Sequence, residues 1–202
     1  MIDIVATFIV FFAVIDPIGT VPVFIAVTRQ YDEVEKRRIA FLATAVAAGV
    51  LLFFVVAGEF ILGYLQIPLS AFQIAGGIVL FLFALSMIFG ESKPDEEVRL
   101  AESHSETAIF PLAVPSIAGP GAMLAAVLMT ENTRVSISEQ LQIVLVIFAV
   151  LLIVLVLMLA SDWISKIIGS SGASVISRVM GLILAAVATS NTLSGIQTYF
   201  SL

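Results

Sequence analysis

The chain has 202 residues, of which 60% are hydrophobic and only 12% are charged, and its mean hydropathy is +1.16. Soluble domains are usually about 45–50% apolar and about 25% charged, so this composition excludes an ordinary soluble enzyme and a disordered protein. A net charge of −6 offers no basic stripe for phosphates, which excludes a nucleic-acid binder. The absence of cysteine excludes disulfides, thiol nucleophiles and iron–sulfur sites.

Long stretches without charge are the main feature of the chain. A helix needs roughly 20 apolar residues to cross a bilayer, whereas the strands of a membrane barrel alternate in polarity and run only about 10 residues. Six stretches are of the helical kind: 4–28, 39–58, 69–90, 107–130, 140–161 and 179–202. Charged residues delimit them, except that Gly63 and Pro68 set the start of the third, and only Asp16 interrupts the first. The sequence therefore predicts an all-α integral membrane protein with six transmembrane helices.

Basic residues predict the orientation of these helices. Loops that face the cytoplasm carry an excess of Lys and Arg. Seven of the nine basic residues lie in the loops that follow odd-numbered helices: Arg29, Lys36, Arg37, Arg38, Lys93, Arg99 and Lys166. We therefore expect these loops in the cytoplasm and both termini outside, in a multi-pass protein of the cytoplasmic (inner) membrane.

The two halves of the chain resemble one another. A shift of 100 residues aligns 12–27 with 112–127 with five identities, and shifts of 103 and 104 align two further segments in the same order. Each half holds three predicted helices, and this odd number makes the second copy enter the membrane from the opposite side. The sequence thus predicts an inverted 3+3 repeat, the plan of many secondary transporters. Its copies are 1–90 and 107–202, joined by an acidic cytoplasmic linker over 91–106.

The first and fourth predicted helices are interrupted at matching places. The interrupting residues are Asp16, Pro17, Gly19 and Pro22 in the first helix and Pro115, Gly119, Pro120 and Gly121 in the fourth. Proline breaks helical hydrogen bonding, and the freed backbone groups cannot face lipid. We therefore expect both helices to be broken near mid-membrane, with non-helical backbone around both Gly19 and Gly119. Paired breaks of this kind indicate the binding site of a transporter.

Asp16 can cap a second half-helix that begins with Pro17, and Gly119 and Pro120 can do the same in the fourth helix. The half-helix N-termini would offer N–H groups to a carboxylate, while Asp16 would bind an ammonium or carry a proton. A purely capping role for Asp16 stays open. So do two roles for the polar segment 190–192, which either lines the cavity or bonds to neighbouring helices. The candidate substrate-binding residues are Asp16, Gly19, Thr20, Ser116, Gly119, Gly121 and Asn191.

Enzyme chemistry finds no support in the sequence. There is no HExxH motif and no histidine within a predicted helix. Asp16 is the sole carboxylate near mid-membrane, whereas an aspartyl protease needs two. We expect no enzyme activity, metal or cofactor. The expected partners are a small-molecule substrate, a coupling ion and the lipid bilayer, and a homo-oligomer stays open.

Four ordered motifs carry a resemblance to a known family. They are the segments 16–24 (DPIGTVPVF), 72–81 (FQIAGGIVLF), 110–122 (FPLAVPSIAGPGA) and 178–184 (RVMGLIL). Together they resemble the MarC family of six-span bacterial and archaeal membrane proteins, and the resemblance covers essentially the whole chain. It implies a size and plan similar to those of LysE-type amino-acid exporters, and transport of small neutral amino acids such as glycine and alanine.

The sequence and the resemblance together predict a secondary transporter. It would move a small neutral amino acid by alternating access, driven by a proton or sodium gradient. Two other functions stay open. One is a non-transporting membrane adaptor or sensor subunit, and the other is a passive channel.

Overall fold

All secondary structure in the described part of the chain is helical. The computed structural model describes residues 2–89, 112–130 and 135–200. The predicted linker over 91–106 lies outside the described residues. The helices are α1 (Ile4–Ile15), α2 (Pro17–Val27), α3 (Glu33–Tyr64), α4 (Leu69–Phe89), η1 (Leu112–Ile117), α7 (Pro120–Met129), α8 (Ile137–Leu159) and α9 (Ser161–Phe200).

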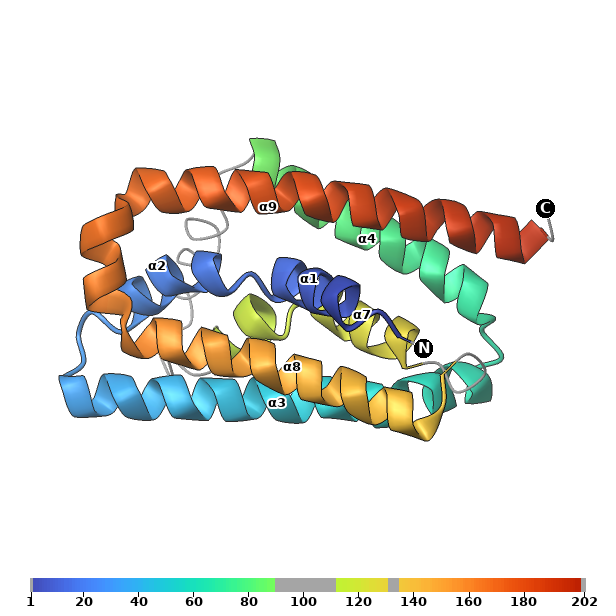
Figure 1. Cartoon of the computed structure of the whole chain (residues 1–202), viewed down its shortest axis with the longest axis horizontal. Helices are drawn as coiled ribbons and strands as arrows, with labels where there is room; N and C mark the ends of the chain where they lie inside the picture. The colour runs from blue at the N-terminus through green and yellow to red at the C-terminus, as the bar shows by residue number, and fades with distance from the viewer. Residues whose placement is uncertain (1, 90–111, 131–134, 201–202) are drawn as a thin grey trace.

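Five helical stretches of the described chain are long and apolar enough to cross a membrane. They are Ile4–Val27, Glu33–Tyr64, Leu69–Phe89, Ile137–Leu159 and Arg178–Phe200. Each coincides with a stretch predicted from the sequence, so the prediction of an all-helical, multi-pass membrane protein is confirmed. The remaining predicted stretch, 107–130, contains η1 and the short apolar helix α7. Figure 1 shows that α9 changes direction sharply near its start, and only its later part forms a long straight helix.

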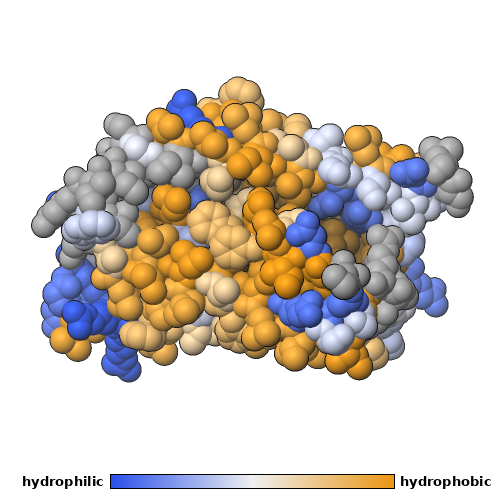
Figure 2. All heavy atoms as spheres, viewed as in Figure 1, coloured by the Kyte–Doolittle hydropathy of each residue, from blue (hydrophilic) through white to orange (hydrophobic). Residues whose placement is uncertain are grey.

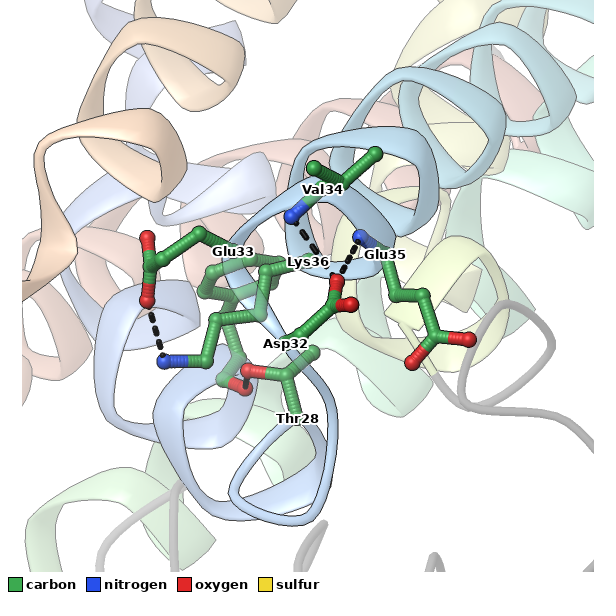
Figure 3. A network of polar contacts seen from close by, with 7 residues as sticks. Thr28, Asp32, Glu33, Val34, Glu35 and Lys36 are labelled. Atoms are coloured by element: carbon green, nitrogen blue, oxygen red, sulfur yellow. Dashed lines mark hydrogen bonds and ion pairs between the residues drawn. The ribbon is translucent and has the colours of Figure 1, made fainter.

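The turn between α2 and α3 shows how local sequence fixes a helix end. Asp32 Oδ1 accepts hydrogen bonds from the N–H groups of Val34 and Glu35 at 2.9 and 2.8 Å, and so caps α3. Lys36 Nζ lies 2.9 Å from Glu33 Oε1 in the first turn (Figure 3). Because these bonds are exposed, α3 begins with a charged, solvated turn before its apolar stretch.

The helices pack in three layers. Figure 1 shows α3 and α8 along one side and α4 and α9 along the other, with α1, α2 and α7 between them. The contacts between helices agree with this view, since α3 touches α8, α4 touches α9, and the middle layer touches both. Figure 2 shows an apolar surface over much of the face in view, with hydrophilic residues at the end where α3 begins and others toward the opposite end. Such an exterior suits a hydrocarbon environment.

Glycines bring α4 and α9 into close contact. A Cβ atom at Gly77 of α4 would meet the Ala188 carbonyl and Thr192 on α9. A Cβ atom at Gly181 of α9 would likewise meet the Ala84 carbonyl on α4. The early part of each helix thus faces the late part of the other, so the two run antiparallel. Small residues allow the close approach of membrane helices on which this packing depends.

We predict that Gly77→Ala lowers the stability of the protein. Alanine favours a helix over glycine by about 1 kcal/mol. The added methyl group would nevertheless press on the α9 backbone, and such overpacking typically costs about 1–3 kcal/mol. Thermal unfolding in detergent measures the difference. The matched control is Gly49→Ala, because nothing lies within 4 Å of a Cβ atom at Gly49. An unchanged or raised unfolding temperature for Gly77→Ala would contradict this packing.

Candidate functional site

Asp16 forms the break between α1 and α2. It ends α1 and caps α2 with left-handed backbone angles, φ 50° and ψ 68°. Aspartate tolerates this region because its short polar side chain can hydrogen-bond locally. Its Oδ1 atom accepts the Gly19 N–H at 3.0 Å, and Pro17 occupies the first position of α2. The prediction that Asp16 caps α2 and that Pro17 is the first residue of this helix is confirmed.

The second carboxylate oxygen of Asp16 has no partner. The residue is 1% exposed, and Oδ2 is the one buried side-chain oxygen or nitrogen of the described residues without a hydrogen bond. No basic side chain of the described chain forms an ion pair with it. A buried polar atom left unpaired costs free energy, and a buried charge costs more. This oxygen is therefore available to a ligand or a proton.

Gly19 provides space for the Asp16 carboxylate. A Cβ atom at Gly19 would collide with that carboxylate. The prediction of non-helical backbone around Gly19 is wrong, since Gly19 lies in the first turn of α2. The break lies at Asp16 instead, because Asp16 has the left-handed backbone conformation. Pro17, which follows it, has the φ angle that starts a helix.

The second break separates η1 from α7. Gly119 is extended, with φ −72° and ψ 169°, and it caps α7 without any side-chain hydrogen bond, while Pro120 takes the first helical position. The predicted roles of Gly119 and Pro120 are confirmed. The chain is further interrupted at Val114, whose backbone is also extended (φ −142°, ψ 116°) within η1.

The two breaks lie beside each other in the core. Ser116 Oγ donates to Thr20 Oγ1 at 3.5 Å, and Thr20 Oγ1 donates to the Asp16 carbonyl at 3.1 Å. Two residues before Asp16 in the chain, Val14 lies against Gly121. Asp16, Thr20 and Ser116 are each at most 1% exposed. Residues almost a hundred positions apart thus form one buried polar cluster.

The structure brings six of the seven candidate residues together at these breaks. The exception is Asn191, which is half-buried on α9 and has no hydrogen bond to the other six among the described residues. Sequence reasoning missed Leu80 of α4, whose side chain lies against Gly121. An apolar residue in an apolar helix carries no signal that could have identified it.

We predict that Gly19→Ala destabilises the protein through Asp16. The new methyl group would displace the carboxylate and break the cap, whose loss costs about 1 kcal/mol. With Asp16→Ala already present, the same substitution meets no carboxylate and should cost little. A double-mutant cycle of unfolding free energies measures this coupling. Equal effects of Gly19→Ala in both backgrounds would contradict the contact.

Comparison with known proteins agrees with this architecture. The family model described as MarC family integral membrane protein matches residues 1–200. A UPF0056 membrane protein of Methanocaldococcus jannaschii is 36% identical over 189 residues, covering 92% of each chain. One from Archaeoglobus fulgidus is 32% identical, covering 95% of this chain and 91% of its own.

A UPF0056 membrane protein of the bacterium Aquifex aeolicus is 29% identical, covering 96% of this chain and 92% of its own. No solved structure matches the chain. Because the family model spans nearly the whole sequence and the archaeal relatives align along almost their full length, the chain belongs to the MarC family of integral membrane proteins.

Proposed function

We propose that the protein is a secondary transporter of small neutral amino acids, of the glycine and alanine type, in the cytoplasmic membrane. The observation that carries this proposal is the buried Asp16 carboxylate, with one unpartnered oxygen, where two broken helices meet. Placing a carboxylate inside a membrane protein is costly and is usually functional. In this proposal, Asp16 binds the ammonium group of the substrate or carries a proton.

The proposal includes an inverted repeat, which the packing of α4 against α9 supports. Adding 104 to a residue number on α4 gives its repeat equivalent on α9. Under this exchange, the close contacts of Gly77 become those of Gly181. These contacts are Gly77 with Ala188 and Thr192, and Gly181 with Ala84 and Ile88. Because the equivalent helices run antiparallel, the axis that relates them is perpendicular to both. Such an axis lies in the membrane plane, as in inverted-topology transporters.

Contacts between whole helices support the same symmetry. The helix α2 touches α9 and α8, and its counterpart α7 touches α4 and α3. Likewise, α1 touches α8 while η1 touches α3. Exchanging the two halves of the chain therefore reproduces this set of neighbours. We propose that η1 and α7 form part of a sixth, broken span that is equivalent to α1 with α2.

The position of the first break supports a site near mid-membrane. Asp16 follows the 12-residue α1 and precedes the 11-residue α2. At 1.5 Å per residue, each half-helix is about 17 Å long, roughly half the hydrocarbon thickness of about 30 Å. The freed backbone and the carboxylate would then lie deep in the bilayer, shielded by the outer helices.

Orientation is the first testable part of the proposal. The basic turn between α2 and α3 should be cytoplasmic, and the opposite end of α3 should face outside. Gln30→Cys and Tyr64→Cys place exposed thiols at these two ends in a chain that has no cysteine. A membrane-impermeant thiol reagent should label position 64 but not position 30 in intact cells. Labelling of both after permeabilisation is the control, and the reverse pattern would contradict the orientation.

The second test separates a binding role of Asp16 from a capping role. Asp16→Asn keeps the capping oxygen but removes the charge, whereas Asp16→Ala removes both. Loss of a charged partner costs about 1.5–3 kcal/mol, so counterflow of labelled alanine in proteoliposomes should fall about tenfold or more for Asp16→Asn. Its unfolding temperature should stay close to that of the unmodified protein.

Asp32→Asn is the matched control, because Asp32 caps α3 in the same way but is exposed and lies beyond the opposite end of α2 from Asp16. It should transport normally. Full transport by Asp16→Asn would show that Asp16 only caps α2.

A non-transporting adaptor or a passive channel remains the alternative function. An adaptor would give no counterflow, and a channel would give flux that does not saturate with alanine concentration. The proposal includes no enzyme activity and no cofactor. Its partners are the amino acid, a coupling ion and the lipid bilayer.

A further inference from the structure

The first turns of α3 present an exposed face that carries two arginines. The members of this face recur every three or four residues, so they lie on one side of the helix, and all of them are exposed: Val34, Arg37, Arg38, Phe41 and Ala45. The other side of these turns is buried at Ala40, Ala43 and Ala47. The exposed side, which we name the arginine face, therefore points away from the protein interior.

The charges of both arginines are free. Among the described residues, no hydrogen bond or ion pair involves the side chain of Arg37 or Arg38. Of the three acidic residues in this turn, one caps α3, and Glu33 lies 2.9 Å from Lys36 Nζ. In Figure 3 the third carboxylate, that of Glu35, points away from this pair. The two guanidinium groups are thus available to an anion from outside the protein.

The two arginines lie at the level expected for lipid phosphates. Arg38 directly precedes the uncharged stretch 39–58, which at 1.5 Å per residue is about as long as the hydrocarbon core is thick. Side chains on a helix lean toward its N-terminus, so both guanidinium groups lean away from the hydrocarbon. Phe41 lies one turn further in and is exposed on the same face. Charge at the headgroup level thus adjoins apolar surface at the acyl-chain level.

We infer that the arginine face binds an anionic phospholipid in the leaflet at the start of α3. Its phosphate would bind Arg37 and Arg38, and an acyl chain would lie along Phe41 and Ala45. The planar guanidinium group matches phosphate oxygens bidentately. A zwitterionic lipid carries its own cation, which the arginines repel, so an anionic headgroup is preferred. This inference does not depend on the proposed transport.

Tryptophan fluorescence can report which lipid lies on this face, because brominated acyl chains quench tryptophan on contact. The chain has one tryptophan, so Trp163→Phe provides a background without any. In that background, Ala45→Trp places the probe at an exposed position of the arginine face. Phe60→Trp is the matched probe, because Phe60 is 75% exposed near the other end of α3 and follows an acidic residue.

The binding constant of phosphatidylglycerol relative to phosphatidylcholine is measured in mixed bilayers, with each lipid brominated in turn. We expect a preference of about tenfold or more at position 45 and none at position 60. Each arginine near an anionic headgroup contributes about fivefold. Replacing Arg37 and Arg38 together by glutamine should therefore abolish the preference at position 45. Both residues are exposed and unpaired, so the fold should be unaffected.

Arg29→Gln is the matched control, because it removes an exposed arginine from the turn before α3 but not from the arginine face. It should change the preference by less than about twofold, since exposed charges away from the site are screened. A loss as large as that of the double variant would show a general attraction to the turn and overturn the site. Equal binding of the two lipids at position 45 would also overturn it. So would displacement by soluble inorganic phosphate, which would show a site for free anions.

Discussion

The structure depends on one constraint: backbone groups inside a membrane protein must find partners within the protein, because lipid offers none. Every long described helix meets this constraint by its own hydrogen bonds. The breaks at Asp16 and Gly119 interrupt this pattern, and the fold places both in the middle layer, between α3 with α8 and α4 with α9. Glycines such as Gly77 and Gly181 allow those outer helices to close tightly.

The two breaks differ in backbone conformation and in charge, since Asp16 is left-handed and carries a carboxylate, whereas Gly119 is extended. Each precedes a helix with proline at its first position, yet the capping residue is Asp16 in one half and Gly119 in the other. In the alignment that shifts the chain by 100 residues, the equivalent of Asp16 is Ser116, whose hydroxyl bonds to Thr20. Of these two aligned positions, only 16 carries a carboxylate.

Sequence alone was sufficient for the features that depend on local chemistry. The long apolar stretches predicted the spans, and Asp16 with Pro17 and Gly119 with Pro120 predicted the caps, because proline and short polar residues act on their immediate neighbours. The sequence-based prediction of non-helical backbone around Gly19 was wrong because it overlooked tertiary packing. Gly19 is helical, and a side chain there would collide with the Asp16 carboxylate. Partners such as Leu80 against Gly121 depend on tertiary packing, which no local pattern encodes.

The central claim is that the free oxygen of Asp16 binds the ammonium group of an amino acid. Calorimetric titration of the purified protein with alanine tests this most directly, because it measures binding without transport. The unmodified protein and Asp32→Asn should bind alanine saturably and with equal affinity, whereas Asp16→Asn should bind about tenfold or more weakly, as expected for the loss of a charged partner. Equal affinity in all three proteins would contradict the account.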